Sequence, residues 1–291
     1  MEKVYPATSP TQFLAVACGG SKPDNRPVEN PPWQQRIRRA EQLAEQHPFA
    51  AEVLTFYRHI ANFQLELYHR LQPFSAGRTP VFSSEQPELS LLLESFTQFL
   101  SLVNEKAPPS FARTARELHN SSATDWSELL NHCWSANEQP PAAPADFLAF
   151  AFLQPYAEFV RSRVPLHLEG YTLPLCPFCN RKPVAGILRP QGDGGRRSLL
   201  CGFCLTEWEF RRIICPACGE ENHAKLPVYT AESFPHIRVE CCDACHTYIK
   251  SVDLTKKGLA VPLVDELASI PLDLWAQEHG YEKLHPNLLG M

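Results

Sequence analysis

The sequence predicts an α+β multi-domain protein, with an all-α N-terminal domain, two small tandem β domains and a short helical C-terminal tail. Hydrophobic residues recur at helical spacing between Trp33 and Val164, which indicates amphipathic helices. Nine of the eleven cysteines then lie between Cys176 and Cys245, where short β-type runs alternate with turn residues. The change of pattern near Pro165 predicts a domain boundary.

We expect six helices in the first half and two in the tail. Pro48 ends the first helix and starts the second, and Thr124 is the expected N-cap of the fifth. The expected helices run from Trp33 to about His47, over 49–71, 88–106, 111–120, 124–134 and 146–164, and in the tail over 264–270 and 272–278. The expected segments are an irregular arm (1–31), the all-helical domain (32–168), two four-cysteine domains (169–211 and 212–255) and the tail (256–291).

Composition restricts the class of protein. The formal net charge is −5, which argues against bulk attraction to nucleic acid or anionic lipid. No apolar run approaches the roughly 18 residues that cross a membrane. The apolar run before Cys18 has five residues, shorter than the roughly 7–15 of a secretory signal. We therefore expect a cytoplasmic protein without membrane insertion, in which paired thiols serve as metal ligands rather than disulfides.

Four Cys-x-x-Cys pairs form an internal repeat. The third pair follows the first at an offset of 39 residues, and the fourth follows the second at an offset of 41. Each copy also contains two short β-type runs between its pairs and an aromatic-bearing run after them. A period near forty residues indicates one supersecondary unit copied in tandem. The pairs are Cys176/Cys179, Cys201/Cys204, Cys215/Cys218 and Cys242/Cys245.

The repeat predicts that each unit binds one metal ion through its own four thiolates. Such small β units bury too little apolar surface to fold alone, and a four-thiolate site supplies about 10–16 kcal/mol of folding energy. A crossed arrangement, with the first and third pairs sharing an ion, would leave each unit unable to stand alone. Cys241 could replace Cys242, but its three-residue spacing to Cys245 favours Cys242. His223, His236 and His246 are further substitutes that complete four-cysteine sets do not need.

The residue after each pair usually adopts a left-handed conformation. Gly219 suits that conformation and Asn180 tolerates it, whereas Leu205 and His246 do not favour it. We therefore expect the second knuckle of each unit to be less regular than the first.

These motifs, after a helical N-terminal half, resemble the FdhE family of formate dehydrogenase accessory proteins. The resemblance runs from about Trp33 to the C-terminus and is specific in the cysteine region, with Asn180 standing where the family pattern has Gly. The motifs that carry it are Cys176-Pro-Phe-Cys179, Leu200–Trp208, Arg212–Gly219 and Ile237–Lys250.

The resemblance implies a non-enzymatic, chaperone-like maturation factor in the cytoplasm. Its implied partner is the catalytic, molybdenum-containing subunit of respiratory formate dehydrogenase, which it would bind before export and assembly. The family resemblance also implies two rubredoxin-like sites that bind iron, with zinc as the alternative metal. Consistent with a non-enzymatic role, no nucleophile–base pair, phosphate loop or paired carboxylate stands out in the sequence.

Two other functions stay open. Thiolate-bound iron would permit electron transfer or redox sensing, whereas zinc would exclude both. A zinc-ribbon nucleic-acid binder would need a basic surplus, but residues 170–255 carry ten Lys/Arg and nine Asp/Glu. Two divalent four-thiolate sites would lower that segment to a formal charge of about −3.

The face after each second knuckle is the expected site of partner contact. Two of its aromatic residues could instead simply cover the metal sites. The candidate partner-binding residues are Glu207, Trp208, Arg211, Arg238, Tyr248 and Lys250.

Overall fold

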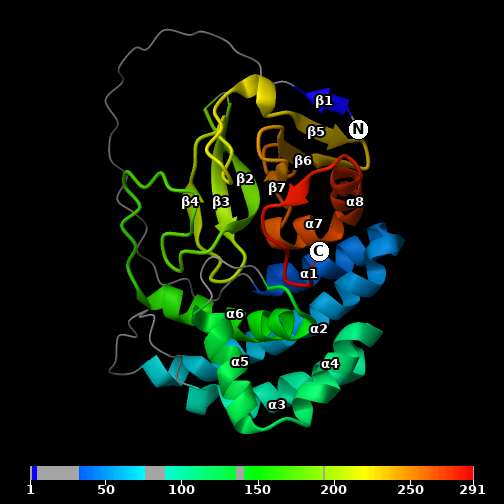
Figure 1. The fold of residues 1–291 in the computed structure, drawn as a ribbon, viewed down its shortest axis with the longest axis vertical. Coiled ribbons are helices and arrows are strands. Elements are labelled where there is room, and N and C mark those ends of the chain that lie inside the picture. The colour runs from blue at the N-terminus through cyan, green and yellow to red at the C-terminus, as the bar shows by residue number, and fades with distance from the viewer. Residues whose placement is uncertain (1, 5–32, 76–88, 136–140, 193, 291) are drawn as a thin grey trace.

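The computed structural model describes residues 2–4, 33–75, 89–135, 141–192 and 194–290. Helices α1–α6 gather at one end of the molecule, and a mixed sheet with α7 and α8 forms the other end (Figure 1). This arrangement confirms the predicted fold class of a helical N-terminal part followed by a sheet region with two four-cysteine clusters. Cys18 and most of the expected N-terminal arm lie outside the described residues.

The helices of the first half agree closely with the amphipathic pattern. Their bounds are α1 Trp33–Gln46, α2 Ala51–Leu71, α3 Leu89–Lys106, α4 Pro109–His119, α5 Ala123–Ser135 and α6 Pro144–Arg163. The predicted N-cap of α5 is wrong. Ser122 lies before the helix, and its Oγ accepts a hydrogen bond from the N–H of Asp125 (3.2 Å), whereas Thr124 lies within the first turn.

Helix α6 is the centre of the helical domain. Its stretch from Phe147 to Ala157 is buried throughout, because other helices pack on one side and the sheet on the other. Phe152 contacts Phe96 and Phe99 of α3 at ring-centroid distances of 4.8 and 5.6 Å. An apolar helix of this kind belongs to a core rather than to a surface.

The strands form one mixed sheet in the order β1-β5-β6-β7-β2-β3-β4, with β8 paired to β7. The strand bounds are β1 Glu2–Val4, β2 Pro183–Gln191, β3 Gly194–Cys201, β4 Glu207–Glu209, β5 Val228–Ala231, β6 Phe234–Cys242, β7 Thr247–Asp253 and β8 Glu282–Lys283. One expectation is corrected here. Glu2–Val4 pair with β5 instead of belonging to an irregular arm.

The two cysteine units share this sheet through one parallel pair of strands, β2 and β7. Gly186 lies opposite Ser251 in this pair. A Cβ added at Gly186 would lie 2.0 Å from the Ser251 Oγ, so the close approach of the two strands requires glycine there. The two predicted units are therefore joined by backbone pairing as well as by sequence.

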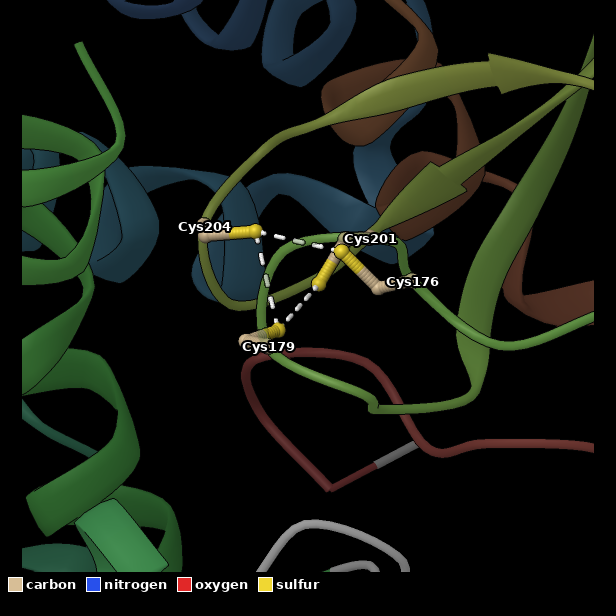
Figure 2. Close-up of side chains that lie close together, drawn as sticks. All are labelled: Cys176, Cys179, Cys201 and Cys204. Carbon is tan, nitrogen blue, oxygen red and sulfur yellow. Dashed lines mark hydrogen bonds between the residues drawn. The ribbon is translucent and has the colours of Figure 1, made fainter. Parts of the chain in front are cut away.

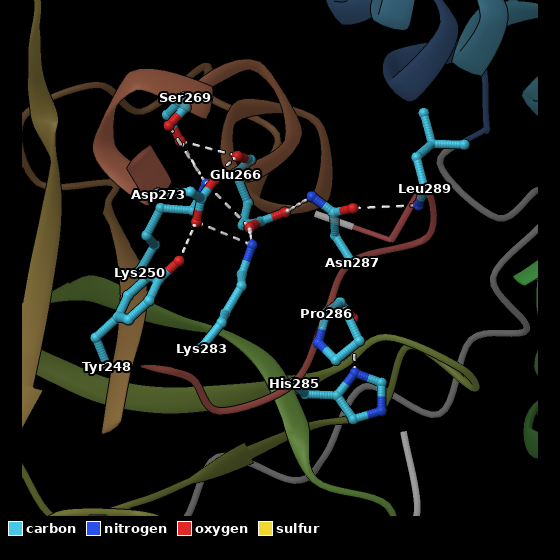
Figure 3. Close-up of polar contacts among 10 residues, drawn as sticks. All are labelled: Tyr248, Lys250, Glu266, Ser269, Asp273, Lys283, His285, Pro286, Asn287 and Leu289. Atoms are coloured by element: carbon cyan, nitrogen blue, oxygen red, sulfur yellow. Dashed lines mark hydrogen bonds and ion pairs between the residues drawn. The ribbon is translucent and has the colours of Figure 1, made fainter. Parts of the chain in front are cut away.

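Helices α7 (Pro262–Ala268) and α8 (Ile270–Glu278) cover one face of the sheet. Ile237 and Val239 of β6 pack with Leu272 and Ala276 of α8. Figure 3 shows the polar network beneath these helices, in which the Lys250 Nζ contacts Glu266 and Asp273 at 3.0 and 2.6 Å. Lys283 contacts the same two carboxylates, so the buried charges balance.

A buried ion pair connects the helical domain to this end of the molecule. Arg39 of α1 donates two hydrogen bonds to Asp265 of α7, and the His236 Nε2 lies 2.8 Å from the same carboxylate. These contacts join α1, β6 and the C-terminal tail.

Among the described residues, no helix has the length and apolar character needed to cross a membrane.

Candidate metal centres

All four Cys-x-x-Cys pairs form the same knuckle. The residue after each pair has a positive φ, with values of 55° at Asn180, 57° at Leu205, 77° at Gly219 and 56° at His246. Asn180, Leu205 and His246 are the only non-glycine residues with positive φ in the part of the chain that the structure describes. The expectation of less regular second knuckles is wrong. The left-handed conformation costs a non-glycine residue about 1–2 kcal/mol, so the surrounding turn and its ligands must impose it.

Backbone hydrogen bonds close the knuckles in the same way. In three of them the first Cys donates its N–H to the carbonyl oxygen five residues later: Cys176 to Arg181, Cys201 to Thr206 and Cys215 to Glu220, each at 2.8–2.9 Å. The Phe203 N–H also donates to the Cys201 Sγ at 3.4 Å. Hydrogen bonds of this kind favour a thiolate at the sulfur that accepts them.

The first cluster consists of Cys176, Cys179, Cys201 and Cys204, whose sulfur atoms point toward one another (Figure 2). The distances Cys176–Cys204 and Cys179–Cys201 are both 3.4 Å, and Cys179–Cys204 is 3.6 Å. A tetrahedral ion with metal–sulfur bonds of about 2.3 Å has sulfur–sulfur edges of about 3.8 Å. The cluster therefore has nearly the dimensions of a four-thiolate metal site, and all four of its cysteines are free and buried.

Burial and hydrogen bonding act in opposite directions on the pKa values of thiols in the first cluster. Burial disfavours a thiolate in the cluster, yet hydrogen bonds from the other three thiols lower the pKa of Cys176 below its ordinary value. Burial raises the pKa values of Cys179 and Cys204 well above theirs. A bound cation would favour the thiolate form of these cysteines.

The helical domain covers the first cluster. Phe203, which lies between the cluster's last two cysteines, contacts Phe150 of α6 and Trp134 of α5 at 4.9 and 5.7 Å. Gln154 of α6 donates to the carbonyl oxygen of Gly202 at 2.7 Å. The loop that holds two thiols is therefore fixed by side chains from a distant part of the sequence.

Arg161 of α6 provides positive charge beside the same cluster. Its Nε donates to the Thr206 Oγ1 at 3.2 Å, and that hydroxyl lies 3.1 Å from the Cys204 Sγ. Burial lowers the pKa of Arg161, while the Cys204 and Cys176 thiols favour its charged form. Sequence reasoning missed Gln154 and Arg161, because single polar residues in an apolar helix carry no motif.

The second cluster consists of Cys215, Cys218, Cys242 and Cys245. The distances Cys215–Cys245 and Cys218–Cys242 are both 3.7 Å, close to the expected tetrahedral edge. Cys215 and Cys242 are buried, Cys245 is half-buried and Cys218 is exposed. Both clusters can therefore bind one ion each, in the uncrossed grouping.

The alternative ligands lie elsewhere. Cys241 is buried in the core beneath α8, and burial raises its pKa above the ordinary value. Cys242 is its neighbour along β6, so the two side chains point to opposite faces of the sheet. His236 contacts Asp265, and His223 and His246 lie outside the cluster.

The candidate partner-binding residues do not form one exposed face. Trp208 and Tyr248 are buried and donate hydrogen bonds to the Leu173 carbonyl (3.1 Å) and to Asp273 (2.8 Å). Lys250 is fully buried. The expectation of exposure is wrong for these three residues, because their partners come from segments far along the chain.

The other three candidates lie nearer the surface, and each forms an ion pair. Glu207 is half-buried and pairs with Arg189, Arg238 is half-buried and pairs with Asp253, and Arg211 is exposed and pairs with Glu221.

Comparison with known proteins follows the same division of the chain. The family model described as FdhE, central domain, matches residues 175–212, and the one described as FdhE, C-terminal domain, matches residues 213–289. A "Protein FdhE homolog" from Aquifex aeolicus is 28% identical over 270 residues, which cover 87% of this chain and 94% of that protein. The chain is therefore similar to FdhE proteins over most of its length.

Other FdhE proteins extend the similarity through the helical domain. A homolog from Haemophilus influenzae is 27% identical over 267 residues, covering 86% of this chain and 85% of the relative. The crystal structure of the FdhE protein from Pseudomonas aeruginosa superposes with a TM-score of 0.66 at 25% identity, covering 88% of this chain and 95% of that one. The similarity to FdhE proteins thus extends beyond the two matched domains to the arrangement of the fold.

Proposed function

We propose that this protein is a non-enzymatic accessory factor of formate dehydrogenase. It binds the catalytic subunit of the respiratory enzyme in the cytoplasm and supports its maturation. Similarity to FdhE proteins is the observation that carries this proposal. The two four-cysteine clusters support it further, because they stabilise a rigid sheet that can present a binding surface.

We also propose the metal ligands of the two sites. Cys176, Cys179, Cys201 and Cys204 hold one ion, and Cys215, Cys218, Cys242 and Cys245 hold the other. Four thiolates suit iron and zinc, and iron is the metal that the family resemblance favours. When bound, a divalent ion offsets half of the charge of the four thiolates and joins the strands of each unit. Anaerobic purification with metal analysis and an absorption spectrum identifies the metal, because ferric tetrathiolate is strongly coloured and zinc is not.

A pull-down tests the accessory function. The tagged, metal-loaded protein is expected to retain the catalytic subunit of formate dehydrogenase from the same host. Deletion of the gene is expected to lower formate dehydrogenase activity, and the wild-type gene is expected to restore it. Normal activity in the deletion strain, together with no retained subunit, would overturn the proposal.

One observation favours a second candidate function, electron transfer or redox sensing at the second cluster. Cys218 is exposed, so a redox partner could approach that ion closely. Replacement of iron by zinc separates the two functions, because zinc keeps the fold but has no redox step. If zinc-loaded protein restores formate dehydrogenase activity as well as iron-loaded protein does, redox chemistry is excluded.

A further inference from the structure

The sheet face that α7 and α8 leave uncovered contains a cavity of about 340 Å³ beside the second cluster. Its floor follows from the strand register. Val228, Glu240 and Ile249 lie side by side on β5, β6 and β7, and Leu188 lies opposite Arg197 on β2 and β3. Directly paired residues in a sheet share a face, and all five of these side chains line the cavity.

One wall of the cavity is the segment 212–216, which links the two cysteine units. Ile213, which is 42% exposed, is one of the few large apolar side chains at the described surface. Arg212 precedes it and Cys215 of the second cluster follows. The cavity therefore combines a floor of apolar and charged side chains with an apolar residue at its edge, as ligand sites commonly do.

The charge of the lining is unbalanced. Arg197, Arg212 and Arg238 line the cavity, and Glu240 is the single carboxylate among the described lining residues. Arg197 pairs with Glu240 (2.6 Å), and Arg238 pairs with Asp253 (2.7 Å) outside the lining. Arg212 forms no ion pair with any residue that the structure describes.

A buried donor in the same lining also lacks an acceptor. The Arg197 side chain is 2% exposed, and its terminal nitrogens donate to Glu240 and to the carbonyl of Arg211. Its Nε is buried with no hydrogen-bond partner in the described structure. Because this nitrogen reaches almost no solvent, Arg197 is held in place by its partners within the protein, and the accessible positive charge of the lining lies at Arg212.

We propose that this cavity binds a short extended segment of the partner protein that presents a carboxylate beside apolar side chains. The inference rests on the proposed accessory function. The carboxylate accepts hydrogen bonds from the exposed Arg212 guanidinium, and the apolar side chains cover Ile213, Leu188 and Ile249. The guanidinium–carboxylate pair fixes the orientation of the bound segment, and burial of its apolar side chains supplies most of the affinity.

A competing role for Arg212 is compensation of the second metal site. Four thiolates with a divalent ion carry a formal charge of about −2 close to Cys215. If Arg212 serves that ion, its removal lowers metal content. If it serves the partner, its removal lowers partner affinity at constant metal content.

Arg212→Glu is the test variant, and Arg113→Glu is its matched control, since Arg113 is an exposed arginine on α4 in the helical domain. The probe is the intact catalytic subunit of formate dehydrogenase, titrated into each full-length, metal-loaded protein. Arg212→Glu is expected to weaken binding by about tenfold or more, because it places like charges together. Arg113→Glu is expected to bind as the wild type does, and both variants are expected to keep two metal equivalents.

A photo-crosslinking amino acid in place of Ile213 then identifies the bound segment by mass spectrometry. The expected crosslink is to a stretch of the catalytic subunit that contains Asp or Glu next to apolar residues. Equal binding by Arg212→Glu, loss of a metal equivalent in it, or a crosslink to a second copy of this chain would each overturn the cavity proposal alone. If the wild-type protein binds no catalytic subunit, the accessory function fails and the cavity proposal fails with it.

Discussion

The two cysteine clusters have the same thiol spacing and the same knuckle backbone, but their surroundings differ. Every cysteine of the first cluster is buried, and helices α5 and α6 cover its second knuckle. In the second cluster Cys218 is exposed, and the knuckle at His246 is fastened by the tail, where the Glu282 N–H donates to the His246 carbonyl at 2.7 Å. The repeat thus fixes the arrangement of the four sulfur atoms, whereas the neighbouring segments determine how exposed each cluster is.

This difference predicts unequal coupling to the fold. The cysteines of the first cluster belong to the main hydrophobic core with residues of the helical domain, such as Phe150 and Leu153. The second cluster lies outside that core, with Cys241 beside it in a smaller one. Metal loss at the first site should therefore destabilise the helical domain, and metal loss at the second should not.

The largest expected effect compares Cys201→Ala with Cys242→Ala. A structural four-thiolate site contributes about 10–16 kcal/mol, which equals or exceeds the total stability of a typical domain. Cys242→Ala should remove one metal equivalent and unfold the second unit while the helical domain stays folded. Cys201→Ala should also reduce the helical circular dichroism signal. Metal analysis with circular dichroism measures both, and loss of both ions in Cys242→Ala would show that the units do not bind independently.

The next effect concerns the tail that fastens the second unit. Burial lowers the pKa of His285 to about 4, and its ring lies 6.1 Å from that of Phe150. In the unfolded state His285 therefore binds a proton below pH about 6.5, whereas in the folded state it binds one only below pH about 4. Stability falls as the pH falls through this window, by about 3 kcal/mol in total.

The variant His285→Gln isolates this contribution. It should lose about 3 kcal/mol less than the wild-type protein between pH 7 and pH 4, because Gln does not titrate. Urea unfolding at several pH values, followed by circular dichroism, measures the difference. Parallel pH profiles of stability for the two proteins would mean that the pKa of His285 is the same in the folded and unfolded states.

A chelator should distinguish the two ions by rate. The exposed thiol of Cys218 lets a chelator approach the second ion directly, whereas release from the first requires local opening of the core. Two phases of one equivalent each are expected, with rates that differ by about tenfold or more. Cys218→Ser should accelerate only the fast phase. A single phase of two equivalents would contradict the comparison.

The smallest effect concerns the strained residues of the second knuckles. His246 is exposed, so His246→Gly should stabilise the protein by about 1 kcal/mol through relief of its positive φ. Leu205 packs against the core beneath α7. In Leu205→Gly, the stability lost with the buried side chain should therefore cancel the stability gained by relief of the positive φ. Thermal melting of the two variants measures the difference, and equal gains would mean that Leu205 contributes no packing.

Local patterns were sufficient to predict the helices and the two clusters of four cysteines. Helix α2 ends at Leu71 as its hydrophobic stripe predicts, and the four thiols of each unit meet because Cys-x-x-Cys spacing directs two sulfurs to one point. Both signals lie within a few residues of the structure that they specify.

Long-range contacts were not predictable in this way. Lys250 looked solvent-exposed in a short strand, but its carboxylate partners Glu266 and Asp273 come from helices later in the chain. The support of the first cluster by Gln154 depends on how α6 docks against the sheet, which no motif encodes. The left-handed Leu205 contradicted its own propensity, because the knuckle hydrogen bonds override it.

The parallel pairing of β2 with β7 has a consequence for synthesis on the ribosome. All four cysteines of the first unit leave the ribosome before β7 does. Strand β7 contains Ser251, which lies opposite Gly186 of β2 in the folded sheet. During that interval the edge of β2 has no neighbour and is open to other strands. The nascent protein can therefore load its first ion early, but its sheet is protected from wrong pairing only after the second unit has been made.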